Sequence, residues 1–152
     1  MELYPEFAAK YRVFMMPSLQ DPGNMLRLAH APCELADRQG FKLLSVGRLV
    51  ELKGFHLCVK SLKMLRDDGL DATWYVAGDG PFRKELEEEI ARYSLQDHFI
   101  LLGNCENPYC YMLNADVCVQ PSSYEGLHVT VWEEKMLSKP VVVSDIPAHR
   151  EL

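Results

Sequence analysis

Several features that mark whole classes of protein are missing from this sequence. The five cysteines form no Cys-x-x-Cys pair and are odd in number, which argues against a zinc site and a secreted disulfide framework. No apolar run approaches the roughly 18 residues of a membrane-spanning helix, and no basic segment followed by an apolar core opens the chain. These absences predict a reduced, cytoplasmic protein with no transmembrane segment. Peripheral association with the inner face of a membrane stays open.

Positive charge is scarce as well. The 152 residues include 16 Lys and Arg against 22 Asp and Glu, a net charge of −6, whereas a nucleic-acid-binding protein carries a basic face. We therefore expect no nucleic-acid partner, although a local pair of cations could still hold a phosphate. Apolar residues make up 48% and charged residues 25%, which are ordinary globular values that exclude disorder, collagen and coiled coil.

From residue 41 onward, short apolar runs alternate with segments of helical spacing. The runs predict five strands, at 42–46, 73–77, 99–102, 117–120 and 140–143. The segments between them predict helices near 55–65, 82–93, 108–114 and 127–138. This alternation predicts an α/β fold, a doubly wound (Rossmann-like) parallel sheet covered on both faces. Ligands bind such sheets beyond the carboxyl ends of the strands, so the loops after the strands are the candidate site.

The first 40 residues follow a different pattern. Four prolines are spread through them, one strand-like run lies at 12–16, and the Asp-Pro-Gly-Asn cluster at 21–24 predicts a turn. We expect 1–40 to be a lead-in or interdomain linker outside the core, and 41–152 to be the α/β domain. Because the chain stops inside what resembles the first turn of another helix, we expect that domain to be truncated at its C-terminus.

Two cations follow the first predicted strand. Arg48 and Lys53 lie in the loop that leads to the next helix, which begins near Gly54. An arginine fork and a lysine point charge suit a diphosphate, and the helix N-terminal amides would add to them. Taken alone, however, the two side chains are more readily explained as solvated loop cations.

A glycine pair follows the second predicted strand, at Gly78 and Gly80. A dinucleotide fingerprint would need a third glycine where Arg83 stands, so the sequence does not predict a Rossmann dehydrogenase. The simpler interpretation is a tight strand-to-helix turn with Pro81 in the first helical turn. Direct contact with a ligand is the alternative.

The loop after the fourth predicted strand carries Glu125, and Glu133 follows in the next helix. A carboxylate beside a glycine at a helix N-terminus suits sugar hydroxyls, which donate charge-assisted hydrogen bonds to it. Alternatively, Glu125 caps the helix and Glu133 with Glu134 forms a solvated face. His128 is interpreted as a packing or hydrogen-bonding residue. The other histidines, including His149, receive no role.

In order and spacing, the chain from about residue 41 resembles the C-terminal, donor-binding half of glycosyltransferase family 4, the retaining GT-B enzymes. The matching segments are Val46-Gly47-Arg48-Leu49, Lys53-Gly54, Val76-Ala77-Gly78-Asp79-Gly80-Pro81, Leu101-Leu102-Gly103, Asn114-Ala115-Asp116, Pro121-Ser122-Ser123-Tyr124-Glu125-Gly126, Glu133, Lys139-Pro140-Val141-Val142 and Asp145-Ile146-Pro147. The spacing of Glu125 and Glu133 fits the family's signature of two glutamates separated by seven residues.

The resemblance implies a hexosyltransferase of bacterial surface polysaccharide synthesis. It would transfer a sugar, with retention, from a UDP or GDP type of nucleotide-diphosphate sugar to an acceptor saccharide or lipid-linked glycan held by an N-terminal domain. The family usually needs no metal, and no other cofactor is expected. Without the N-terminal domain the chain would hold half a site, so we expect weak nucleotide binding and little transfer by the chain alone.

The resemblance also assigns site residues. The implied catalytic residues are Arg48 and Lys53, which would hold the diphosphate and stabilise the leaving group, and Glu125, which would contact hydroxyls of the transferred sugar. The implied substrate-binding residues are Gly47 in the first loop, Gly103, Asn104 and Cys105 for the base, Gly126 and Leu127 for the phosphate, and Glu133 for the ribose. Glu134 stands where alanine is usual and is expected to add a negative charge near the diphosphate.

Two other functions stay open. A non-catalytic nucleotide-binding or protein-interaction module is a different class of protein that the same residues would allow. A GT-B sugar epimerase shares the fold, but the order of the motifs fits it less well.

Overall fold

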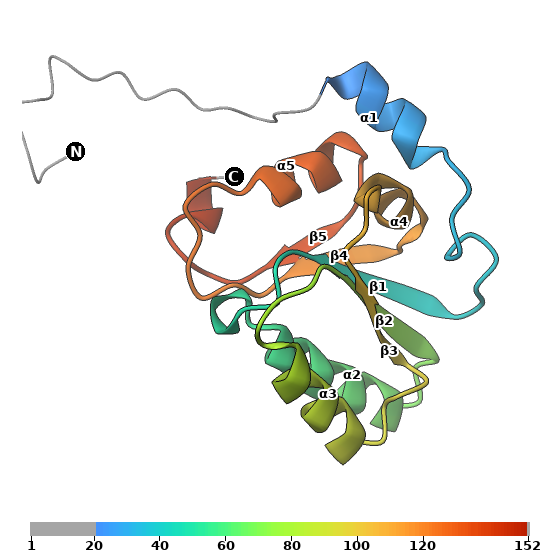
Figure 1. Ribbon diagram of the computed structural model, residues 1–152, viewed down its shortest axis with the longest axis vertical. Coiled ribbons are helices and arrows are strands. Elements are labelled where there is room, and N and C mark those ends of the chain that lie inside the picture. The colour runs from blue at the N-terminus through green and yellow to red at the C-terminus, as the bar shows by residue number, and fades with distance from the viewer. Residues whose placement is uncertain (1–20, 152) are drawn as a thin grey trace, which may run out of the picture.

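The computed structural model describes residues 21–151, which form a five-stranded parallel sheet in the order β3-β2-β1-β4-β5, with helices on both faces (Figure 1). The strands are β1 (Phe41–Val46), β2 (Ala72–Ala77), β3 (Phe99–Gly103), β4 (Val117–Gln120) and β5 (Val141–Val143). The predicted doubly wound α/β fold is confirmed. The strand order reverses between β1 and β4, which makes that junction the topological switch point where ligands bind in such sheets.

The helices divide between the two faces of the sheet (Figure 1). On one face lie α2 (Phe55–Asp67) and α3 (Arg83–Arg92), and on the other α1 (Pro22–Ala29), α4 (Pro108–Asn114) and α5 (Val129–Met136). Short 3₁₀ turns, η2 (Glu51–Lys53) and η3 (His149–Glu151), follow β1 and β5. Within residues 21–151, no helix has the length and apolar character needed to cross a membrane.

Two apolar cores lie on opposite faces of the sheet, because successive side chains of a strand point to opposite sides. In β1, Leu43 belongs to the core under α2 and α3, whereas Leu44 belongs to the core under α1 and α4. In β2, Trp74 and Tyr75 divide in the same way. Burial of both faces explains why the strands appear in the sequence as continuous apolar runs.

Residues 21–40 contribute to a core, contrary to the prediction. The Asp21 carboxylate accepts a hydrogen bond from the Asn24 amide at 2.8 Å and caps α1, with Pro22 in the first turn, so the predicted turn is the start of a helix. Met25 and Ala29 are 1% and 0% exposed and pack with Leu44. The strand predicted at 12–16 lies outside the described residues, and the division of the chain into domains stays a prediction.

Candidate functional site

The loops that follow the five strands meet at one edge of the sheet, because the strands are parallel. The switch point between β1 and β4 brings the loop after β1 against the loop after β4. Gly54 marks their contact, because a Cβ added to it would lie 2.4 Å from the Pro121 carbonyl oxygen. The Ser123 amide also donates to the Leu52 carbonyl oxygen at 2.8 Å. The two segments that the sequence singled out therefore form one surface.

An open cavity of about 430 Å³ lies at the ends of β1, β2 and β3. Its lining residues are Arg48, Gly78, Asp79, Gly80 and Asn104. Within the described part of the chain, the Arg48 guanidinium has no hydrogen-bond or ion-pair partner, so its five donors face solvent. This arrangement leaves a cation free to bind an anion of the size of a diphosphate.

The glycine turn after β2 forms the wall of this cavity and also holds the Arg48 loop in place. A Cβ at Gly78 would lie 1.9 Å from the Gly47 carbonyl oxygen, and one at Gly80 would lie 2.3 Å from that of Leu49. Backbone hydrogen bonds from Leu49 to Asp79 at 3.0 Å and from Gly78 to Gly103 at 2.8 Å join the loops. The tight strand-to-helix turn is confirmed, and it lines the cavity, but Pro81 precedes the N-cap Phe82 and does not lie in the first turn of α3 as predicted.

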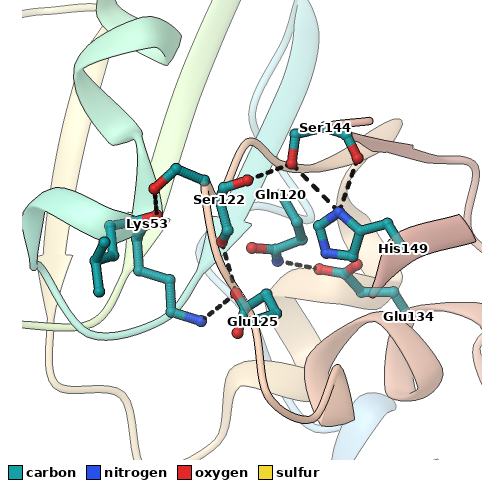
Figure 2. Close-up of polar contacts among 9 residues, drawn as sticks. Lys53, Gln120, Ser122, Glu125, Glu134, Ser144 and His149 are labelled. Carbon is teal, nitrogen blue, oxygen red and sulfur yellow. Dashed lines mark hydrogen bonds and ion pairs between the residues drawn. The ribbon is translucent and has the colours of Figure 1, made fainter. Parts of the chain in front are cut away.

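Lys53 and Glu125 form an ion pair at the switch point (Figure 2). The Lys53 Nζ lies 2.6 Å from Glu125 Oε1, and the Ser122 hydroxyl donates to the same oxygen at 2.6 Å. The side chains of Lys53 and Glu125 are 24% and 13% exposed. Lys53 is therefore a paired cation, which rules out the alternative that it is a solvated loop cation. Glu125 is no capping acid either, since α5 begins after His128 without a side-chain cap hydrogen bond.

Glu133 is buried on the inner side of α5, so the alternative of a solvated face is wrong. It is 8% exposed, and the Tyr109 hydroxyl donates to its Oε1 at 2.9 Å. Burial raises the pKa of Glu133, while the hydrogen bond from Tyr109 partly opposes that rise. Burial and the contact with Glu133 raise the pKa of Tyr109 to about 12, so Tyr109 stays a donor at neutral pH.

Glu134 does not add the expected negative charge. It is fully buried, and burial raises its pKa to about 8 even though Gln120 donates to its Oε1 at 2.7 Å. At neutral pH the carboxyl group is therefore mostly protonated and neutral. Its hydrogen bond with Gln120 ties α5 to β4, which gives it a structural role (Figure 2).

His149, which sequence reasoning left without a role, lies in the wall of the site. It is 6% exposed, and its Nδ1 lies 3.0 Å from the Ser144 carbonyl oxygen. Its ring centroid lies 5.6 Å from that of His128, a contact that agrees with the prediction of a packing role for His128. A second cavity of about 10 Å³ is lined by Lys53, Gln120, Glu125, His128 and His149 among others. Nothing in the sequence pattern placed His149 beside the loop after β4.

The other predicted substrate-binding residues lie in different places: in the open cavity, against a core, or in solvent. Gly103 ends β3 with a φ of +74°, and Asn104 joins Arg48 in the open cavity. Cys105 is half-buried against the core that contains Tyr109, and burial raises the pKa of its thiol. A Cβ at Gly126 would meet nothing within 4 Å, and Leu127 is 69% exposed. The predicted substrate-binding roles of all these residues stay predictions.

Among residues 21–151, no group of three or more His, Cys, Asp or Glu side chains is placed to hold a metal ion. The charged groups that line the two cavities include Arg48, Asp79 and the Lys53–Glu125 pair. The parallel sheet with helices on both faces is a Rossmann-like domain, the fold found in GT-B glycosyltransferases.

The chain belongs to the family described as "Glycosyl transferases group 1", whose sequence model matches residues 32–152. It is 30% identical over 140 residues to an uncharacterized glycosyltransferase of Methanocaldococcus jannaschii, covering 90% of this chain and 34% of the relative. It is 33% identical over 152 residues to the 2-deoxystreptamine glucosyltransferase of Streptomyces kanamyceticus, covering 91% and 38%. The chain thus spans about a third of the length of these relatives.

The fold is shared with solved structures. The pneumococcal O-GlcNAc transferase GtfA, solved in complex with UDP and GlcNAc, matches with a TM-score of 0.72 and 24% identity over 96% of this chain and 28% of that chain. At that identity the likeness shows the fold alone.

Proposed function

We propose that this chain is the donor-binding half of a retaining, family 4 glycosyltransferase. The observation that carries the proposal is the Lys53–Glu125 pair at the switch point, beside the cavity that contains the free Arg48 guanidinium. A nucleotide-diphosphate sugar needs cations for its phosphates and an acceptor of hydrogen bonds for its sugar hydroxyls. The solved UDP complexes of structural neighbours support a donor of the UDP type, with GDP as the other candidate.

In the proposed reaction, the bond between the anomeric carbon and the diphosphate oxygen breaks, and the nucleoside diphosphate leaves with the electron pair. The acceptor hydroxyl oxygen bonds to the anomeric carbon on the same face, and its proton passes to the oxygen of the departing diphosphate. Arg48 and Lys53 would stabilise the charge that develops on the leaving diphosphate, an effect worth about 2.7–4 kcal/mol per donor in comparable sites. No metal ion or other cofactor is part of the proposal.

In this proposal, Glu125 Oε2 accepts hydrogen bonds from hydroxyl groups of the transferred sugar. Its Oε1 accepts from both Lys53 and Ser122, whereas Oε2 has no hydrogen bond within the described residues. Glu133 would hold the ribose, Gly47, Gly126 and Leu127 would approach the phosphates, and Gly103, Asn104 and Cys105 would meet the base.

We place the acceptor, a saccharide or lipid-linked glycan, on an N-terminal domain, and the whole enzyme in the cytoplasm or at the inner face of the membrane. Bacterial surface polysaccharide synthesis is the proposed process. Relatives named for colanic acid biosynthesis in Escherichia coli and for the lipopolysaccharide core in Rhizobium meliloti support it, at 28% and 31% identity.

A non-catalytic interaction module is the second candidate. The observation that favours it is the exposure of two large apolar side chains, Tyr124 and Leu127, each 69% exposed on the loop that carries Glu125. A protein-binding role would use this loop as a contact surface, and nucleotides would then leave its amide signals unchanged.

The deciding experiment is a titration of the chain with UDP, GDP and ADP, followed by backbone amide chemical shifts. The proposal expects one nucleotide to shift signals at 47–54, 103–105 and 125–133. A folded chain whose signals do not respond to any of the three would overturn the donor-binding proposal and favour the interaction module.

A further inference from the structure

Hydrogen bonds at both the backbone and the side chain of Ser122 connect His149, after β5, to Glu125, after β4 (Figure 2). His149 Nδ1 lies 3.0 Å from the Ser144 carbonyl oxygen and 3.3 Å from the Ser144 hydroxyl. The Ser144 hydroxyl donates to the Ser122 carbonyl oxygen, and the Ser122 hydroxyl donates to Glu125 Oε1 at 2.6 Å. Four residues from two loops are thus joined in series.

The direction of each bond follows from the chemistry of the groups. A carbonyl oxygen only accepts, so the imidazole of His149 must carry a hydrogen on Nδ1 to bond to Ser144. The Ser144 hydroxyl donates its hydrogen to the Ser122 carbonyl oxygen. Toward His149 it can therefore act only as an acceptor, in addition to the Ser144 carbonyl oxygen. The arrangement is consistent only if His149 is the donor that orients Ser144.

The path runs through groups that cannot reorient freely. Ser122 is 0% exposed and His149 is 6% exposed. The His149 ring also packs against His128, the residue before the first turn of α5, which has no side-chain cap hydrogen bond. The His149 imidazole therefore contacts the loop of residues 121–128 near both of its ends. At one end it acts through Ser144, which bonds to Ser122, and at the other end it packs on His128.

We propose that His149 is a positioning residue that orients the Glu125 carboxylate through Ser144 and Ser122. Lys53 alone would hold Glu125 loosely, because an ammonium on a flexible stem accepts many geometries. The second bond, from Ser122, restrains the same Oε1 from another loop position and so limits how far the carboxylate and its unpartnered Oε2 can turn. Supporting hydrogen bonds of this kind hold a binding group in its productive geometry. The inference rests on the proposed function to the extent that Oε2 meets a donor sugar.

The first test needs no ligand. The Ser123 amide donates to Leu52 at 2.8 Å, so its hydrogen exchange reports how firmly the loop is held. We expect His149→Leu and Ser144→Ala each to speed this exchange about tenfold, the loss of one buried hydrogen bond. His149→Asn should restore slow exchange, because the asparagine amide N–H can occupy the place of Nδ1–H. His30→Leu, at an exposed histidine, is the matched control and should change nothing.

The second test compares binding of UDP with binding of UDP-glucose, or of GDP with GDP-mannose if GDP is the nucleotide that binds. His149→Leu should weaken the sugar nucleotide about tenfold more than the bare nucleotide, because Glu125 meets the sugar. His149→Asn should recover most of that loss. Thermal unfolding of each variant shows whether the chain is still folded.

The outcomes separate the two proposals. If the wild-type chain binds no nucleotide, the proposed function fails, and the exchange of Ser123 still decides whether His149 holds the loop. If nucleotides bind, but His149→Leu weakens both ligands equally or asparagine does not rescue, then His149 is a packing residue only and the inference is overturned.

Discussion

The two halves of the strand-end surface are built in opposite ways. The glycine half, formed by Gly47, Arg48, Gly78, Gly80 and Asn104, is backbone packed against backbone around a cavity of about 430 Å³. The carboxylate half, formed by Lys53, Ser122, Glu125, Ser144 and His149, is a hydrogen-bonded side-chain network around a cavity of about 10 Å³. One half provides space beside a free cation, and the other provides a charge in a fixed orientation.

Each half depends on a different property of its residues. In the glycine half, Gly78 and Gly80 must lack a Cβ, because a Cβ at either position would lie 1.9 Å or 2.3 Å from a backbone carbonyl oxygen. The carboxylate half needs particular donors and acceptors, because Lys53, Ser122, Glu125, Ser144 and His149 are joined by specific hydrogen bonds. Mutations of Gly78 and Gly80 should therefore act mainly on folding, and mutations in the carboxylate half mainly on the geometry of the site.

The largest effect is expected from Gly78→Ala. Its Cβ would lie 1.9 Å from the Gly47 carbonyl oxygen at a φ of +147°, so overlap and backbone strain add. We expect a loss of about 3–6 kcal/mol in the free energy of unfolding, measured by urea denaturation. Gly69→Ala is the matched control, because its φ is +89° but nothing lies within 4 Å, and it should lose about 1–2 kcal/mol. Equal losses would mean that close packing does not define the glycine half.

Glu134→Gln should change the pH dependence of stability. Burial raises the Glu134 pKa from its ordinary 4.5 to about 8, so between these values the folded chain holds a proton that the unfolded chain releases. Rising pH therefore lowers the stability of the wild type in this window. Urea denaturation between pH 5 and pH 8 should show a loss of roughly 3 kcal/mol that is largely absent in Glu134→Gln. Parallel curves for the two proteins would contradict a buried, protonated Glu134.

Arg48→Ala should weaken nucleoside diphosphate binding about 10–100-fold, because charge-assisted hydrogen bonds to phosphate are lost. Stability should change little, since the side chain has no partner among the described residues. Calorimetric titration with the nucleotide that binds measures the effect. Lys84→Ala removes a cation that is 85% exposed on α3 and should leave affinity unchanged. If the two variants bind alike, the free guanidinium does not make the glycine half an anion site.

The smallest effect is expected for the Lys53–Glu125 pair. A double-mutant cycle with Lys53→Met and Glu125→Gln should give a coupling of about 1 kcal/mol, because the pair is only partly shielded from water. The same cycle at Lys63 and Asp67, whose side chains are 37% and 60% exposed, should give less. Urea denaturation measures both. A coupling at the first pair no larger than at the second would argue against a fixed geometry in the carboxylate half.

How far the sequence could predict this protein depended on the kind of signal. The strands were predicted well because buried parallel strands are apolar on both faces and leave continuous runs, as at 73–77. The segment 21–24 was interpreted as a turn because Asp-Pro-Gly-Asn also fits a helix start, and the burial of Met25 was needed to decide. Glu133 and Glu134 were ambiguous because adjacent carboxylates on a helix resemble a solvated face.

The sequence by itself determined the α/β fold and the loops that carry Arg48, Lys53 and Glu125, because apolar periodicity and turn residues are local signals. Tertiary structure alone decided that Lys53 pairs with Glu125, that burial raises the pKa of Glu134, and that His149 reaches Glu125 through two serines. Those outcomes depend on distances between segments far apart in the chain and on how much water each group loses. A local pattern of residues determines neither these distances nor this loss of water.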